Sequence, residues 1–431
     1  MQKVQVDVTD LQIGMYVADL DRPWRETPFL FQGFEIRTQE ELDALKRYCR
    51  TVQVLVREAE RSVAAARKPA APGYLSAEVM SPRQQALKIE QEMFKLNNHP
   101  GARSFYDDTT TLEEEVQSAA EIYEDARVLL HESMSDARLG RSLNVPGVKR
   151  LIGGMVESIL RNPDALTCFA QLKRKDDYTA MHSMRCAVLA LVFGRQLGMP
   201  REQLLVLGLG ALLQDVGKAR LPSELLNKPE ALTPEETRLV KQHVDFGIEI
   251  VSSTPNIPSA ALEVVSNHHE RFDGSGYLKG LRGDDIGVLG AIGAIVDQYD
   301  AMTSERPYRL PVAAHAVLKQ MYEWRGRLFH PIMVEKFIQC LGIYPIGSIV
   351  QLNSGEVGVV ATMNRKQRLK PRVVLVRKPD MTPYLDRPLV SLIDRRTSTG
   401  RTCEIESVLE PAAVGIDPAQ YLPVQIRLTA A

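Results

Sequence analysis

Histidines and aspartates with the potential for metal chemistry are concentrated in the middle of this chain. The set comprises His182, Asp215, His243, His268, His269 and Asp297. Imidazole and carboxylate ligands together suit iron, manganese or zinc. A carboxylate that bridges two ions about 3.5 to 4 Å apart would activate water for in-line attack on phosphorus. Because the six side chains come from five separate elements, they predict one metal site at which those elements converge.

Local sequence distinguishes these residues from ordinary helical histidines, which are more often core or surface residues. The segment Gln214-Asp-Val-Gly-Lys218 ends an apolar helix with a carboxylate, and Lys218 is close enough to it to reach a phosphate oxygen. Adjacent His268 and His269 cannot both face inward from the middle of a helix, since successive residues lie about 100° apart. They predict a helix that ends at the site. We interpret the remaining histidines as ordinary residues: His99, His131, His315 and His330.

The elements that must position these residues suggest a multidomain protein. Residues 1–60 predict a small α+β domain, with alternating polarity from Val4 to Val8 and a capping box from Thr38 to Glu41. Residues 61–111 form a poorly patterned linker region rich in Ala, Arg, Lys and Pro. Residues 112–343 predict a mainly all-α helical bundle with a lead-in helix, and residues 344–431 a small β domain. Within these regions, 3.6-residue periodicity predicts helices over 112–139, 148–160, 178–197, 202–213, 234–251, 260–269, 289–302 and 312–322.

Charge and composition exclude several classes of function. The 53 basic and 54 acidic side chains give a net charge of −1, so neither a nucleic-acid polymer nor a membrane surface is an expected partner. Apolar runs are about half of the roughly 20 residues that a membrane span needs. Five cysteines without a C-x-x-C pair suit a reducing compartment, and we expect a cytoplasmic protein.

Five motifs resemble those of the HD-GYP family, bacterial phosphodiesterases of cyclic di-GMP. They occupy residues 182–185, 214–218, 268–277, 280–283 and 297–309, and the resemblance extends over about 150 to 340. Some members of the family also carry an N-terminal domain of unknown function and a short β tail. The resemblance implies an HD-type helical domain that hydrolyses cyclic di-GMP with two divalent ions, iron or manganese.

The resemblance also implies a role for each matching residue. Metal ligands would be His182, Asp215, His243, His268, His269 and Asp297, with Asp215 as the bridge. Lys218 would contact the scissile phosphate, Arg306 and Arg309 would hold the phosphates of the ligand, and Tyr277 would lie beside a guanine. A dianionic dinucleotide needs such cations in a chain whose net charge is near zero.

Two positions depart from the family pattern. The histidine that precedes the aspartate is here Gln214, and the proline of the Gly-Tyr-Pro motif is here Leu278. An amide oxygen is a poorer donor to these metals than imidazole, so we expect weaker binding of the ion held by His182, Asp215 and Asp297. The second ion keeps all its side chains, and Leu278 leaves the loop that presents Tyr277 freer than proline would.

Three functions therefore remain open at the level of sequence. The favoured one is metal-dependent hydrolysis of cyclic di-GMP, with activity impaired by Gln214. The alternative is a catalytically inactive module that senses the dinucleotide or docks a partner such as a diguanylate cyclase (GGDEF-type) through the Tyr277 loop. Hydrolysis of another nucleotide is the least favoured. The sequence leaves the oligomeric state open.

Overall fold

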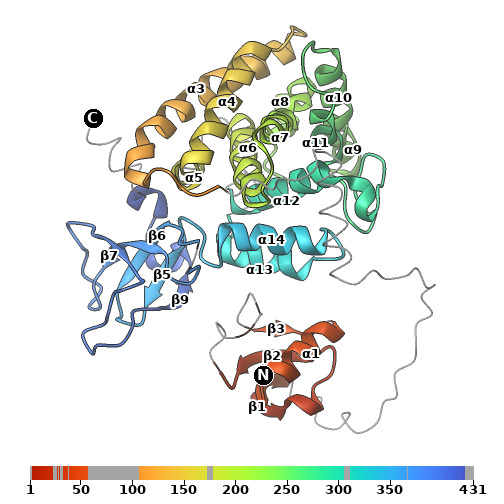
Figure 1. Cartoon of the computed structure of the whole chain (residues 1–431). Coiled ribbons are helices and arrows are strands. Elements are labelled where there is room, and N and C mark those ends of the chain that lie inside the picture. Colours follow the sequence, from red (N-terminus) through yellow and green to blue (C-terminus); the bar gives the residue numbers. More distant parts are fainter. Residues whose placement is uncertain are drawn as a thin grey trace, which may run out of the picture. The chain divides into compact units, whose positions relative to one another are not determined.

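The fold is known from a computed structural model, which describes residues 2–22, 27, 29, 33–36, 38–56, 106–171, 178–304, 311–365 and 367–422. The chain divides into two compact units, Met1–Val79 and Met80–Ala431. The first unit contains a small sheet and one helix. The second contains a helical bundle and a second sheet (Figure 1). The predicted fold class, a mainly helical multidomain protein with a small domain on either side, is confirmed.

The N-terminal unit is an antiparallel sheet packed with one helix. Its strands are β1 (Gln2–Asp7), β2 (Tyr16–Leu20), β3 (Phe34–Glu35) and β4 (Thr51–Val56), in the order β1-β4-β2-β3. Helix α1 (Gln39–Tyr48) begins with the predicted capping box between Thr38 and Glu41. Val17, Ile36 and Leu45 form the centre of its core. This unit has an apolar interior of its own.

Helices account for most of the second unit between residues 112 and 341. They are α3 (Leu112–Arg138), α4 (Val145–Arg161), α5 (Pro163–Ala170), α6 (Tyr178–Gln196), α7 (Arg201–Leu213), α8 (Ser223–Leu226), α9 (Pro234–Lys241), α10 (His243–Ser253), α11 (Ala261–Asn267), α12 (Val288–Thr303), α13 (Ala314–Glu323) and α14 (Pro331–Leu341). Two 3-10 segments, η4 (Val216–Arg220) and η5 (Gly283–Ile286), connect α7 to α8 and lead into α12. Figure 1 shows α6, α7, α11 and α12 close together in the middle of the bundle.

The structure corrects one predicted helix and adds others. The continuous helix expected over residues 234–251 is wrong, because α9 ends at Lys241 and α10 begins at His243. Its periodicity continues across the break at Gln242, which keeps helical backbone angles, so apolar spacing alone could not reveal it. Helices α5, α8 and α14 were not predicted from periodicity. Helix α11 ends at Asn267, two residues earlier than the predicted range of 260–269, so the helix end expected at the site lies directly before the paired histidines.

A five-stranded antiparallel sheet follows the bundle. Its strands are β5 (Ile349–Leu352), β6 (Val357–Thr362), β7 (Arg372–Arg377), β8 (Leu389–Ser391) and β9 (Ile405–Leu409), in the order β8-β7-β6-β5-β9. All six residues of β6 are buried. The short helix α15 (Pro411–Val414) and the 3-10 segment η6 (Pro418–Tyr421) come after β9. The sheet lies within residues 344–431, for which the sequence predicts a small β domain.

An ion pair between a buried aspartate and an exposed arginine joins this sheet region to the bundle. Arg365 Nη2 lies 2.7 Å from Asp164 Oδ1 in α5, and its Nη1 lies 2.6 Å from Asp108 Oδ2. The other oxygen of Asp164 accepts a hydrogen bond from Met363 N at 2.9 Å. Residues 106–111, which we assigned to the linker region, therefore contact the bundle, and Tyr106 also donates to Met199 O at 3.1 Å. Residues 61–105 of that region lie outside the described residues.

Two further findings concern membrane-spanning helices and disulfide bonds, neither of which the composition predicts. Within the described part of the chain, no helix is both long and apolar enough to cross a bilayer. Each of the five cysteines is free.

The Arg365 pair should contribute measurably to stability. Burial raises the pKa of the Asp164 carboxyl, and the charge of Arg365 opposes that rise. Arg365→Met keeps the apolar stem but leaves Asp164 without its counter-charge, so we expect the free energy of unfolding to fall by about 2 kcal/mol. Urea unfolding followed by circular dichroism would measure the loss. Arg238→Met is the control, because the ion pair of Arg238 with Glu235 is exposed and should change stability by less than about 0.5 kcal/mol.

Candidate metal centre

The structure brings all six predicted ligands together at one end of several helices. His182 lies in α6 and Asp297 in α12, whereas Asp215 comes two residues after the end of α7. His243 is the first residue of α10, and His268 and His269 follow α11. Five of the six side chains are almost completely buried, and that of His269 is 16% exposed. Residues separated by up to 115 positions thus share one interior site.

The ligand atoms form two adjacent clusters. In the first, one atom each from Asp215, His243, His268 and His269 lies within 4.8 Å of the others. The second cluster has the same spread and contains His182, Cys186 and Asp297. We name them the triple-histidine cluster and the His182 cluster.

Asp215 connects the two clusters through its two carboxylate oxygens. Its Oδ1 lies 3.3 Å from His243 Nε2 and 3.7 Å from His268 Nε2. Its Oδ2 lies 3.4 Å from His182 Nε2 and 2.5 Å from Lys218 Nζ. One oxygen therefore faces each cluster, which is the arrangement that a bridging carboxylate requires.

When the rings of the triple-histidine cluster are neutral, no proton lies between them. His243 Nδ1 donates to Val240 O at 2.6 Å and His268 Nδ1 donates to Val265 O at 2.9 Å, because carbonyl oxygens only accept. In a neutral ring Nε2 then carries a lone pair, and the two Nε2 atoms lie 3.4 Å apart. Asp215 Oδ1, which both face, is buried without a well-aligned hydrogen bond among the described residues. Three electron pairs directed at one another fit a cation between them.

The pKa shifts favour the protonation states that metal binding needs. Burial lowers the pKa of His243 and, together with the neighbouring His268, lowers that of His269 well below its usual value. Both rings are then neutral and can act as ligands. Burial opposes ionisation of Asp215 and Asp297, but Lys218 beside Asp215 and the His182 hydrogen bond to Asp297 reverse the effect and lower both pKa values. The carboxylates remain charged.

The His182 cluster is held differently, through Asp300. His182 Nδ1 lies 2.7 Å from Asp300 Oδ2, and Arg185 donates to both oxygens of Asp300 at 2.7 and 3.0 Å. The other ring nitrogen of His182, Nε2, lies 3.0 Å from Asp297 Oδ1. Burial disfavours a charged ring, yet the hydrogen bonds to Asp297 and Asp300 raise the pKa of His182 well above its usual value. A proton on Nε2 can therefore occupy the position where a metal ion would bind.

Asp300 and Arg185 are functional neighbours that sequence reasoning missed. Asp300 fixes the ring orientation of His182, a support that metal-binding histidines commonly have. Both residues lie three positions after a predicted ligand on the same helix, Asp300 after Asp297 and Arg185 after His182. This spacing puts them on the ligand face and was the available signal.

Close backbone approach positions the elements of the site. A Cβ atom on Gly217 would lie 2.0 Å from His243 O, so the segment after Asp215 packs against α10 only because residue 217 is glycine. On α12, a Cβ on Gly293 would lie 2.9 Å from Val264 Cγ1 and 3.3 Å from His268 Cβ. Glycine at position 293 therefore allows α12 to pack closely against α11 and His268.

The loop after His269 is organised by a buried carboxylate. Glu270 is fully buried and accepts hydrogen bonds from Lys279 N at 2.6 Å and Leu281 N at 3.0 Å. Within this loop Tyr277 stacks on His269 with ring centroids 4.6 Å apart, and Lys241 Nζ lies 4.7 Å from the Tyr277 centroid. Tyr277 thus adjoins the triple-histidine cluster.

Gln214 is completely buried, and neither its amide oxygen nor its nitrogen has a hydrogen-bond partner among the described residues. An unpaired buried amide costs about 1 to 3 kcal/mol, so a partner such as water or an ion is expected beside it.

Cys186 and the two arginines complete the account of the predicted residues. Cys186 is completely buried, and burial raises the pKa of its thiol to about 11, which keeps it protonated as in a core residue. Arg306 and Arg309 lie outside the described residues.

Comparison with known proteins identifies two matching family models and several relatives. The model described as HD domain matches residues 169–331, and the model described as a domain of unknown function (DUF3391) matches residues 3–147. A cyclic di-GMP phosphodiesterase of Pseudomonas aeruginosa is 31% identical over 96% of this chain and 92% of its own length. A cyclic di-GMP phosphodiesterase of Thermotoga maritima is 36% identical over 38% of this chain and 45% of its own length.

One solved structure, the HDG"Y"P protein Bd1817 from Bdellovibrio bacteriovorus, covers 78% of this chain and 98% of its own length. Its TM-score is 0.42 and its sequence identity is 18%.

The two clusters should differ in metal affinity. His243→Ala or His268→Ala removes a proposed ligand from the triple-histidine cluster, which we expect to bind its ion more tightly than the His182 cluster does. Metal content should therefore fall to less than about half. His182→Ala should lower it less, since Gln214 already weakens that side. Plasma emission analysis of anaerobically purified protein would measure the ions, with the exposed His131→Ala as control. Equal losses in all three ligand variants would contradict the asymmetry.

Proposed function

The chain belongs to the HD-domain family of cyclic di-GMP phosphodiesterases, and from this membership we propose that it hydrolyses a phosphodiester bond of cyclic di-GMP at the Asp215 site. The observation that carries the proposal is the position of Asp215, with one oxygen facing each cluster of ligands. Its similarity to the Pseudomonas phosphodiesterase extends over 96% of the chain, including the N-terminal unit. The relative therefore matches the whole architecture, and its named substrate is the best guide to the substrate here.

We propose two divalent ions, iron or manganese, because the ligands combine imidazole with carboxylate. One would be held by Asp215, His243, His268 and His269, and the other by His182, Asp215 and Asp297. Bound ions of this kind lower the pKa of water and neutralise charge on phosphoryl oxygens. Asp300 and Arg185 keep the His182 ring oriented toward its site.

Lys218 supplies a mobile positive charge at this centre. Its ammonium group lies 2.5 Å from Asp215 Oδ2, and its side chain is 17% exposed, so it lies at the edge of the buried site. When a substrate phosphate approaches, the same ammonium can move from the carboxylate to a phosphoryl oxygen and stabilise the charge that develops there. Asp215 then retains both oxygens for the ions.

Substrate binding would use Tyr277 together with Arg306 and Arg309. Tyr277 packs on His269, so a base beside Tyr277 would lie next to the triple-histidine cluster. The two arginines follow Asp297 by nine and twelve residues and offer planar, permanently charged groups that match phosphate geometry. Because they are proposed to hold the phosphates in the ground state, they should affect binding more than chemistry.

The second candidate function is a binding module that has lost hydrolysis. The observation that favours it is Gln214, whose buried amide replaces the imidazole of the family motif. Such a module would retain the dinucleotide, or dock a diguanylate cyclase (GGDEF-type) through the loop at Tyr277. That partner, an oligomeric assembly and a cytoplasmic location stay predictions.

Substitution of the cationic groups should separate binding from catalysis. Lys218→Ala should lower turnover of cyclic di-GMP by about 100-fold with a smaller change in affinity, because it removes charge stabilisation in the transition state. An Arg306→Ala/Arg309→Ala double variant should weaken dinucleotide binding by about tenfold or more. Calorimetry and a turnover assay would provide the two readouts. Unchanged affinity in the double variant would refute the assigned phosphate contacts.

Restoring the missing imidazole tests whether the protein is an enzyme or a module. Gln214→His adds a ligand next to Asp215 without adding charge at neutral pH, so metal content and turnover should rise together, turnover by about tenfold or more. Gln203→His, earlier in the same helix, is the matched control. A rise in metal content with turnover still absent would favour the module. If neither changes, Gln214 does not face the ions.

A further inference from the structure

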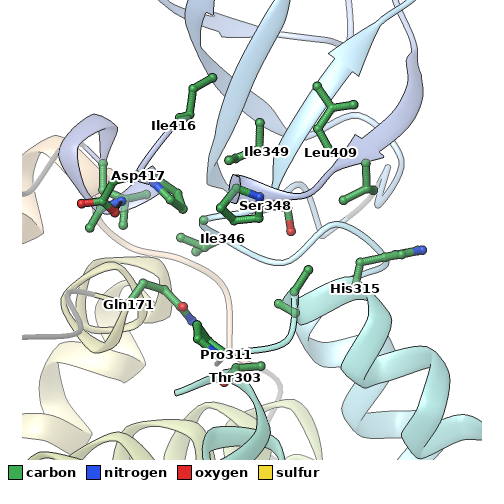
Figure 2. Close-up of a pocket in the computed structure, with 18 of the residues that line it drawn as sticks. Gln171, Thr303, Pro311, His315, Ile346, Ser348, Ile349, Leu409, Ile416 and Asp417 are labelled. Carbon is green, nitrogen blue, oxygen red and sulfur yellow. Dashed lines mark hydrogen bonds between the residues drawn. The ribbon is translucent and has the colours of Figure 1, made fainter. Parts of the chain in front are cut away.

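A cavity lies between the bundle and the C-terminal sheet. Its volume is about 660 Å³, within the range of small-molecule sites. Figure 2 shows side chains from both sides: Gln171, Thr303 and Pro311 from the bundle, and Ser348 and Leu409 from the sheet region. None of the six proposed metal ligands lines it. The cavity is therefore separate from the Asp215 site.

The wall chemistry of this cavity favours an uncharged, mainly apolar ligand. No lysine or arginine is among the lining residues in the described part of the chain, so phosphates have no counter-charge there. Burial lowers the pKa of His315, which is neutral at pH 7. The carboxylate of Asp417 already accepts hydrogen bonds from Ala419 N at 3.1 Å and Gln420 Nε2 at 3.3 Å. Apolar side chains form most of the remaining wall: Val312, Ile346, Ile349, Val408, Leu409 and Ile416.

One polar group in this wall lacks a partner. Ser348 is 7% exposed, and its hydroxyl has no hydrogen bond among the described residues. Its backbone is fully engaged, since its N–H donates to Pro345 O and its carbonyl accepts from Val360 N. A buried hydroxyl without a partner is unfavourable unless something else supplies one. A ligand with one hydrogen-bonding group would satisfy it.

The cavity also adjoins both ends of a segment that matters for the proposed function. Thr303 is the last residue of α12, the helix that carries Asp297 and Asp300. Pro311 and Val312 lie on the other side of residues 305–310, which contain Arg306 and Arg309. A hydrogen bond of 3.0 Å from Val312 N to Met302 O closes the base of this segment. A molecule that fills the cavity would contact residues at both ends of this segment.

We propose that this cavity binds a small, uncharged, mainly apolar effector with one hydrogen-bonding group directed at Ser348. Occupancy would change how α12 and the following segment hold cyclic di-GMP. The proposal that a molecule binds here depends only on the cavity, whereas its role as an effector rests on the proposed function.

Binding can be measured with N-phenyl-1-naphthylamine, an uncharged aromatic amine whose fluorescence rises in apolar surroundings. The full chain should bind one equivalent. Ala313→Trp places an indole in the cavity wall and should weaken binding by about tenfold or more. Ala412→Trp, on an exposed residue of α15 that does not line the cavity, should bind as the unaltered chain does. Circular dichroism would verify folding, and Ala419→Trp on the facing wall is the second variant if Ala313→Trp fails to fold.

Three outcomes would overturn the inference. Equal probe affinity in Ala313→Trp, Ala419→Trp and the unaltered chain would show that the probe binds elsewhere. Binding that appears only after residues 423–431 are deleted would mean that the end of the chain occupies the cavity. Equal affinity for cyclic di-GMP with and without saturating probe would remove the effector role, because linkage requires a reciprocal effect. Failure of cyclic di-GMP hydrolysis alone would count against the proposed function and leave probe binding unaffected.

Discussion

The carboxylate of Asp215 is the group on which the rest of the site depends. A buried carboxylate is stable only if positive charge or hydrogen-bond donors surround it. Lys218 supplies positive charge beside Oδ2, which also faces His182, whereas Oδ1 faces the Nε2 atoms of His243 and His268, which fit a cation between them. The close packing at Gly217 and the position of His243 at the start of α10 serve to place those partners. Loss of Asp215 would separate the two clusters, whereas loss of any single histidine would affect mainly one of them.

Much of this arrangement could be predicted from sequence because motif spacing encodes it. The end of a helix at the paired histidines follows from the 100° rotation per residue, and the convergence of the six proposed ligands follows from residue type and motif resemblance. The break between α9 and α10 could not be predicted, since apolar periodicity continues through Gln242. The role of Asp300 was likewise hidden, because an aspartate in a helix has many roles and only the folded structure shows its contact with His182.

Gln214 shows that one substitution can change the chemical groups of a site while the fold around it stays the same. An amide occupies nearly the space of an imidazole, so the end of α7 can fold in the same way around either side chain. The structure keeps the buried position but leaves both amide atoms without partners among the described residues. The change alters the group offered to the proposed metal site and leaves two buried amide atoms unpaired among the described residues, while the residue keeps its buried position at the end of α7. The family fold can therefore persist where its name-giving histidine is absent.

The contact of Arg365 with Asp164 and Asp108 has a consequence for synthesis of the chain. These contacts join residues 201 and 257 positions apart, whereas every proposed metal ligand has been made once Asp297 is translated. A nascent chain on the ribosome therefore carries a complete set of ligands while the Asp164 carboxylate still lacks its counter-charge. The N-terminal unit can fold during translation, but the bundle reaches its final stability only after most of the chain has emerged.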